Sequence, residues 1–99
     1  RLALDYRSAI LSAREAAQRL EVAGRSRQTA EEALRITRVR YTEGSADVTE
    51  LLTAQNGLTA TRAREDGARY DLWTALSNVE RAGGQLATDG SRQERKGAL

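Results

Sequence analysis

The chain has 99 residues, 30% of them charged, and a formal net charge of only +2, so basic and acidic residues nearly balance. The two signs alternate along the sequence instead of forming one basic block, which argues against a nucleic-acid partner. The absence of Cys and His excludes disulfides and removes the commonest metal ligand and general base. We therefore expect no enzyme, no metal site and no cofactor.

Large core-forming side chains are scarce, because the chain has one Trp and neither Phe nor Met. Such a chain has little with which to build a globular core. It also lacks Pro, which costs a helix interior about 3 kcal/mol, so long helices are expected. No apolar run approaches the roughly 20 residues that span a bilayer. The start at Arg1 without a Met indicates a piece of a longer protein, and we expect that piece to be soluble.

The first predicted helix covers residues 1–43, in which small or apolar residues recur at alternating spacings of four and three. This spacing places them on one stripe of a helix, with a period near 3.5 residues. Such a stripe is typical of a seam that packs against another helix. It comprises Leu2, Tyr6, Ala9, Ala13, Ala16, Leu20, Ala23, Arg27, Ala30, Leu34, Thr37 and Tyr41.

Residues 44–47 are predicted to form a tip turn. Gly44 suits the left-handed position that closes a helix. Either Ser45 or Asp47 then caps the next helix, and Glu50 follows Asp47 at the spacing of a capping box. The local chemistry thus predicts a helix stop followed by a restart.

The second predicted helix covers residues 48–83 and repeats the pattern of the first. Because the connection is short, the two helices are expected to be antiparallel neighbours, in an all-α coiled-coil hairpin. Residues whose numbers sum to roughly 89 should then lie at the same height. From residue 84 to 99 the sequence gains Gly, Ser and charge, and we expect an irregular or flexible tail. The second stripe comprises Leu51, Ala54, Leu58, Thr61, Glu65, Ala68, Leu72, Ala75, Val79 and Ala82.

Two features disturb this simple seam. Arg27, Thr61 and Glu65 interrupt its middle, where they either weaken the seam or face another layer of helices. Each helix also carries a second apolar strip, which one helix pair cannot bury. Alone, the hairpin should therefore be marginal or self-associating. The second strips comprise Ile10, Ala17, Val22, Ala33, Ile36 and Val39, and Val48, Leu52, Ala63, Tyr70, Trp73 and Leu76.

The segment "RYTEGSADVTELLTAQNGLTATRAREDGARYDLWTALSNVERAGG" resembles the second-repeat hairpin of the TolC-like outer membrane efflux protein family. In that family an Arg-Tyr-x-x-Gly turn leads to a Leu-Leu-x-Ala-Gln helix, an Ala-Arg-Tyr-Asp element and a terminal Gly-Gly. Upstream, "LDYRSAILSAREAA" is similar to the preceding family helix, so the resemblance spans residues 2–84. The matching residues are Arg40, Tyr41, Gly44, Leu51, Leu52, Ala54, Gln55, Leu58, Ala68, Arg69, Tyr70, Asp71, Leu72, Ala75, Gly83 and Gly84.

The resemblance implies a homotrimeric channel that exports drugs or other substrates. In such a channel, an outer membrane β-barrel continues into a periplasmic α-helical barrel, which a periplasmic adaptor couples to an inner membrane pump. This chain would be a tip-proximal part of the helical barrel, and would reach the outer membrane only through parts missing from it. By the same resemblance, Tyr41, Gly44 and Ser45 form the tip that docks the adaptor.

The resemblance also places Glu50 and Thr53 at the pore entrance. Some relatives carry a second acid where Thr53 stands, and an Arg where Ala46 stands. Glu50 is therefore expected either to narrow the entrance or to act only as a helix cap, and the two roles are compatible.

Two other functions fit the same pattern of residues. The chain could be the helical hairpin of a periplasmic adaptor, which is the partner side of the same junction. It could also be a generic coiled-coil scaffold module. The pairing of the Arg-Tyr-x-x-Gly and Leu-Leu-x-Ala-Gln segments favours the channel over both alternatives.

Overall fold

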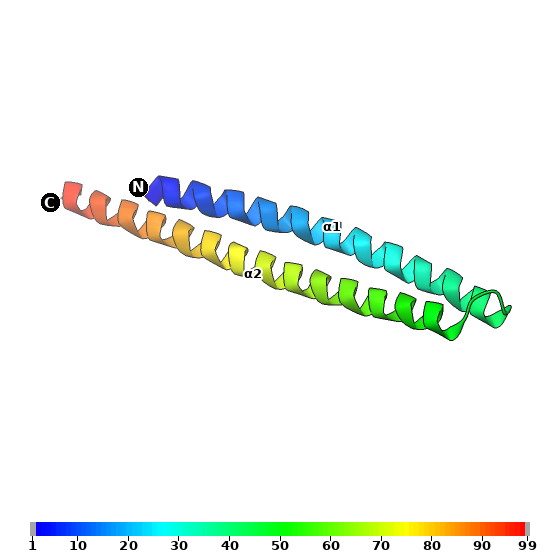
Figure 1. Ribbon diagram of the computed structural model, residues 1–99. Helices are drawn as coiled ribbons and strands as arrows, with labels where there is room; N and C mark the ends of the chain where they lie inside the picture. The colour runs from blue at the N-terminus through cyan, green and yellow to red at the C-terminus, as the bar shows by residue number, and fades with distance from the viewer. Residues whose placement is uncertain (1, 99) are drawn as a thin grey trace.

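Two long helices make up the chain in its computed structural model, which describes residues 2–98 and the side chains of residues 3–85. Helix α1 spans Leu2–Thr42 and helix α2 spans Val48–Ala98. Figure 1 shows them antiparallel and side by side, with both chain ends opposite the turn. The molecule measures 83 × 15 × 13 Å, so it is one helix pair thick along its whole length. The predicted all-α hairpin is confirmed.

The stripe of four-and-three spacing faces the partner helix, as its periodicity predicts. Ala13, Ala16 and Leu34 of α1 are buried against α2, and Leu58 of α2 is buried against α1. The other described members of both stripes are partly shielded, except for Tyr41, which is exposed at the tip. The side chain of Leu2 lies outside the described residues. Small seam residues let the two helix axes approach closely, but they leave a thin core.

The predicted register is confirmed by contacts between the helices. A Cβ atom on Gly83 would lie 3.3 Å from the ring of Tyr6, and one on Gly24 would lie 3.2 Å from the Glu65 carboxylate. Both pairs of numbers sum to 89. The turn therefore sets the height at which every residue of α1 meets α2.

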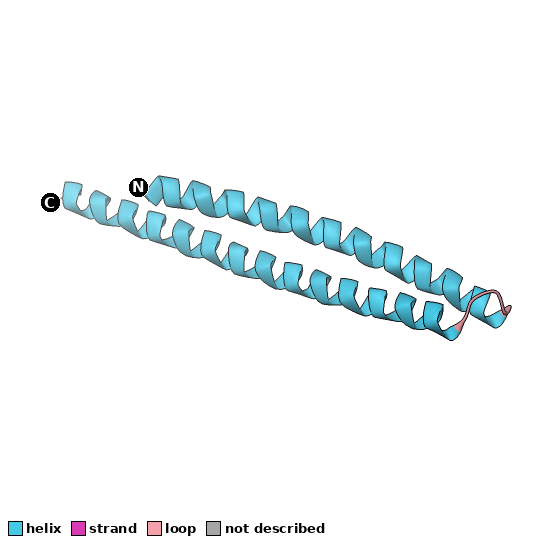
Figure 2. Cartoon of the chain, viewed as in Figure 1, coloured by secondary structure: helices cyan, strands magenta, loops and turns pink. Residues whose placement is uncertain are grey.

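The irregular tail predicted for residues 84–99 is wrong over the described backbone, because α2 continues to Ala98. Figure 2 accordingly draws loop at the tip turn and helix from there towards the C-terminus. A Gly ends a helix by adopting a positive φ, and among the described residues Gly44 is the Gly that does so. In helical conformation, Gly83 and Gly84 each cost about 1 kcal/mol relative to Ala without stopping the helix.

The second apolar strips stay on the surface of the single hairpin. Val22 is 60% exposed on α1, and Tyr70 and Trp73 are 66% and 65% exposed on α2. Neither helix, over the residues described, holds a stretch long and apolar enough to cross a membrane.

Candidate functional site

The turn at residues 43–47 is closed by backbone hydrogen bonds. The Ser45 amide donates to the carbonyl of Arg40 at 2.8 Å, and the Gly44 amide donates to the carbonyl of Tyr41 at 3.1 Å. These are the two bonds of a Schellman motif, with Gly44 in the left-handed position. The Ser45 hydroxyl adds a third bond, to the Arg40 carbonyl at 3.2 Å. Ser45 thus helps to end α1, in addition to lying at the tip.

Gly44 and Tyr41 are open to a partner. The φ angle of Gly44 is +84°, and no atom lies within 4 Å of the place where a Cβ would stand. Tyr41 is 45% exposed one turn earlier. The backbone at Gly44 can therefore be approached closely from outside, with an aromatic side chain beside it.

Asp47, not Ser45, caps α2. Its Oδ1 atom accepts a hydrogen bond from the Glu50 amide at 2.9 Å, which is the first half of a capping box. In the second half of a capping box, the Glu side chain would bond to the backbone amide of the cap residue. Here the Glu50 carboxylate instead lies 3.3 Å from the guanidinium of Arg40. Glu50 therefore joins the two helices across the tip.

Arg40 is the tip residue whose role the sequence reasoning missed. Its Nη2 atom donates to the Ser45 carbonyl at 3.0 Å and also pairs with Glu50. The sequence contained a signal for this pair, because the numbers of Arg40 and Glu50 sum to 90, and residues whose numbers sum to roughly 89 lie at the same height. The structure thus links Ser45 and Glu50 through one arginine, while Gly44 bonds to the carbonyl of Tyr41.

The other two predicted tip positions are turned inward or along the helix. The Thr53 hydroxyl donates to the Thr49 carbonyl of its own helix at 2.8 Å. Ala46, where some members of the resembled family carry an Arg, is buried with 8% of its surface exposed. Thr53 is therefore not joined to the Arg40–Glu50 pair, and Ala46 helps to pack the base of the turn.

The polar residues in the middle of the seam pair with one another. Arg27 Nε lies 2.8 Å from Glu65 Oε1 across the helix interface, and Arg27 Nη1 lies 2.8 Å from Glu31 Oε1. Hydrogen bonds to Glu65 and then to Glu31 raise the pKa of Arg27 above its ordinary value. Arg62 and Arg69 approach Glu31 and Glu65 at 3.9 and 3.7 Å. We call these five residues the central ion-pair cluster.

This cluster corrects one expectation and explains a glycine. Arg27 and Glu65 do not need a partner from a further helix layer, because they form a hydrogen bond with each other within the hairpin. Gly24 leaves room for the Glu65 carboxylate, whose Oε2 atom would lie 3.2 Å from an added Cβ. Close approach at Gly24 therefore involves a side chain, while Gly67 has open space.

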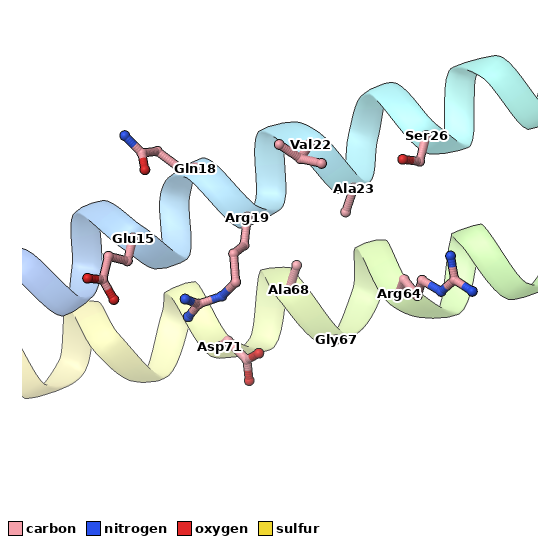
Figure 3. A pocket seen from close by; sticks show the side chains of 10 residues that line it. All are labelled: Glu15, Gln18, Arg19, Val22, Ala23, Ser26, Arg64, Gly67, Ala68 and Asp71. Atoms are coloured by element: carbon pink, nitrogen blue, oxygen red, sulfur yellow. The ribbon is translucent and has the colours of Figure 1, made fainter.

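A groove of about 800 Å³ runs between the two helices near the central ion-pair cluster. Its lining includes four small residues, Ala23, Ser26, Gly67 and Ala68, together with longer side chains such as Gln18 and Val22. Figure 3 shows Arg19 of α1 reaching across towards Asp71 of α2 at one end, and Arg64 at the other. The groove is therefore lined by both small and charged residues.

The described residues contain no group of three or more side chains arranged to hold a metal ion. No protein-family model matches the sequence, and neither a curated protein nor a solved structure matches it. The features that the described side chains present on the surface are the exposed tip, the groove and the apolar strips.

Proposed function

We propose that this hairpin belongs to the periplasmic helical barrel of a TolC-like outer membrane efflux channel, and that its tip docks a periplasmic adaptor. The observation that carries the proposal is the open tip, where Tyr41 is exposed beside a Gly44 with free space around it. An adaptor hairpin can approach this backbone closely, and the Tyr41 ring supplies apolar contact area.

The shape of the hairpin and its surface support the same proposal. A barrel wall needs long helices that pack sideways on both flanks, and both helices here keep exposed apolar residues such as Val22, Ile36 and Leu52. In the proposed parent protein, three copies form the channel in the outer membrane and periplasm. The adaptor then couples that channel to an inner membrane pump, so that drugs or other substrates are exported.

At the pore entrance, the proposal assigns Glu50 a role that depends on Arg40. The pairing at 3.3 Å offsets the charge of Glu50 and holds its carboxylate against α1. An open entrance with a free Glu50 charge would require this pair to separate. Thr53, whose hydroxyl bonds to its own helix, would line the same entrance without charge.

The experiment is a calorimetric titration of the 99-residue chain with helical hairpins from periplasmic adaptor proteins. We expect saturable binding that Tyr41→Ala weakens and Gly44→Arg abolishes. Gly44→Asn is the sharper variant, because Asn tolerates the left-handed conformation while it fills the open space. Gly57→Ala serves as the matched control, because Gly57 also has open space around it but lies within α2.

Binding that is unchanged in Gly44→Asn and Tyr41→Ala would overturn tip docking. If no adaptor hairpin binds while the chain associates with itself, the coiled-coil scaffold is the better function. If the chain binds the tips of TolC-like channels instead, it is the adaptor side of the junction.

A further inference from the structure

One pair of neighbouring residues in α2 has a chemical reactivity that the fold does not use. The chain has two asparagines, Asn56 and Asn78, which are followed by Gly57 and by the β-branched Val79. The backbone nitrogen that follows an asparagine can attack the side-chain amide. A glycine has no Cβ to hinder this approach, whereas a β-branched residue is stiff and bulky. Asn56 is therefore the asparagine whose sequence context favours intramolecular deamidation.

The reaction consumes only water. The Gly57 nitrogen forms a bond to Cγ of Asn56, the bond between Cγ and Nδ2 breaks, and the proton of the Gly57 amide leaves with ammonia. The product is a cyclic succinimide, which water then opens at one of its two carbonyl carbons. Opening at Cγ gives aspartate, and opening at the backbone carbonyl gives isoaspartate, whose main chain runs through the former side chain. Neither an oxidant nor a reductant takes part.

The site is open to water and is not covered by the partner helix. Asn56 and Gly57 are both exposed on α2. No atom lies within 4 Å of the place where a Cβ of Gly57 would stand. Because packing does not shield this pair of residues, any protection against the reaction must come from the conformation of α2 itself.

Helical conformation blocks the attack in two ways. Asn56 and Gly57 lie inside α2, more than two turns after its first residue, Val48. In a helix the amide of Gly57 donates to the carbonyl of Thr53, four residues earlier, so its proton is held. The ψ angle of a helical residue is about −42°, whereas ring closure needs a more extended backbone at Asn56. Asn56 is therefore unreactive while this part of α2 is folded.

This part of α2 is also a weak stretch of helix. Glycine is the poorest helix former after proline, and Gly57 stands in the helix interior. The hydroxyls of Thr53 and Thr59 each donate to the carbonyl four residues earlier, at 2.8 and 3.1 Å, a pattern that slightly destabilises helices. Leu58 is the buried anchor beside Asn56, with 7% of its surface exposed. Local opening around Leu58 would therefore make Asn56 reactive.

An isoaspartate at position 56 would disturb the seam. It adds one methylene to the main chain, so the residues after it are displaced relative to α1. Leu58 follows two residues later, and Glu65, which lies 2.8 Å from Arg27 of α1, follows nine residues later. Both contacts depend on the register of the two helices. Because ammonia has been lost, refolding does not restore the original backbone.

A second pair of residues in the same helix provides a contrast. Asp66 precedes Gly67, whose Cβ position likewise has no atom within 4 Å. The Asp66 carboxylate lies 3.2 Å from Nη1 of Arg69. An ionised carboxylate is a poor target for a nitrogen nucleophile because of its negative charge, so Asp66 should form a succinimide far more slowly than Asn56. The side-chain amide of Asn56 thus distinguishes the site, together with the glycine.

We propose that Asn56 is a deamidation site that the helix holds inactive. Local opening of α2 at Asn56 and Gly57 permits succinimide formation, and the resulting isoaspartate prevents the hairpin from closing again in its original register. The modification thus converts a transient opening into a permanent one. Its chemistry involves one chain and water, so it does not rest on the proposed docking of an adaptor.

Mass spectrometry of the full chain measures the reaction. The chain is incubated at mildly alkaline pH, either folded or unfolded in guanidinium chloride, and is then digested briefly with trypsin at mildly acidic pH. Cleavage after arginine places Asn56 in the peptide 41–62 and Asn78 in the peptide 70–81, so each site is measured separately. We expect Asn56 to deamidate roughly tenfold faster or more in the unfolded chain. Equal rates in the two states, or equal rates at Asn56 and Asn78 in the unfolded chain, would overturn the proposal.

Two variants test whether helix opening sets the rate. Thr59→Ala raises helix propensity beside the site and should slow deamidation of the folded chain roughly threefold. Leu58→Ala removes the buried anchor and should accelerate it. In guanidinium chloride both variants should react at the rate of the parent chain, because no helix remains. Thr59→Ala keeps the test valid if Leu58→Ala does not fold, and an unchanged folded-state rate in Thr59→Ala would contradict protection by the helix.

The effect of the product is tested with two chains that carry the same added charge. Asn56→Asp has a normal backbone. The isoaspartate form is obtained by incubating the parent chain in guanidinium chloride, and is separated by ion exchange and identified by fragmentation in the mass spectrometer. After refolding, we expect Asn56→Asp to regain the circular dichroism of the parent chain and the isoaspartate form to regain less helix. Equal helix content in the two chains would overturn the claim that the modification prevents closure.

Discussion

The tip turn and the central ion-pair cluster are both polar, but they differ in the sequence separation of the residues that contact one another. At the tip, the hydrogen bonds join residues a few positions apart, such as the Ser45 amide and the Arg40 carbonyl at 2.8 Å. In the cluster, Arg27 and Glu65 meet at 2.8 Å although 38 residues separate them in the sequence. The tip can form wherever the local chain adopts the turn, while the cluster requires both helices in register.

The difference shows how a thin hairpin keeps its register. Only a few side chains are buried, among them Ala13, Ala16 and Leu58, so apolar packing alone distinguishes poorly between neighbouring registers. The tip turn fixes where α2 begins. The pairing of Arg27 with Glu65 then stabilises the one register in which the two side chains lie opposite each other. A slipped hairpin would remove the cross-helix partner of the partly buried Glu65, at 2.8 Å, and leave it Arg69 of its own helix, at 3.7 Å.

The largest expected effect is at the tip. Because the φ angle of Gly44 is +84°, Gly44→Ala should lower the free energy of unfolding by about 1–2 kcal/mol. Gly44→Asn should cost less, since Asn adopts the left-handed conformation more readily. Urea unfolding followed by circular dichroism measures both changes. Equal stability of Gly44→Ala and the parent chain would show that the turn does not depend on this conformation.

The glycines of the helices give the next largest effect. Gly67→Ala should raise the free energy of unfolding by about 1 kcal/mol, because Ala is the better helix former and nothing lies near its Cβ. Gly24→Ala should raise it less, since its Cβ would stand 3.2 Å from the Glu65 carboxylate. Both are measured by urea unfolding at concentrations below association.

Glu65→Ala tests whether the Glu65 carboxylate causes the difference between the two glycine variants. With the Glu65 carboxylate removed, Gly24→Ala should raise the free energy of unfolding as much as Gly67→Ala does. If Gly24→Ala is already equal to Gly67→Ala in the parent chain, the contact at Gly24 does not constrain the seam.

Two ion pairs provide the third comparison. A double-mutant cycle with Arg27→Ala and Glu65→Ala should show favourable coupling, because the two side chains are only 26% and 13% exposed. The same cycle on Arg35 and Glu32, whose side chains are 64% and 56% exposed, should show weaker coupling that salt screens. Equal coupling in the two cycles would mean that the cluster contributes no more than a surface pair.

Sequence periodicity predicted most of the fold, since small and apolar residues at four-and-three spacing occupy the seam in both helices. It failed at Gly83 and Gly84, because composition does not reveal whether a Gly keeps helical φ angles. It also missed the partner of Arg27, which depends on the side chains that the register brings opposite it. At the tip, the motif predicted Gly44 and the cap, but not that Arg40 would draw Glu50 away from the capping box.

The smallest expected effect concerns pH at an exposed pair on α1. A hydrogen bond from Arg35 lowers the pKa of Glu32 below its ordinary value. The stability that this pair contributes is therefore present above the ordinary pKa of glutamate, about 4.3, and is lost as the pH falls through the lower pKa of folded Glu32.

Arg35→Gln removes the charge and should return the Glu32 pKa to its ordinary value, which carboxyl NMR titration measures at the single residue. The stability difference between the parent chain and Arg35→Gln should accordingly shrink as the pH falls through this range. Since both side chains are more than half exposed, solvent and salt keep the effect below that of Arg27 and Glu65. An unchanged Glu32 titration in Arg35→Gln would show that the hydrogen bond does not persist in solution, and would leave the cross-helix pair as the one ordered ion pair of the comparison.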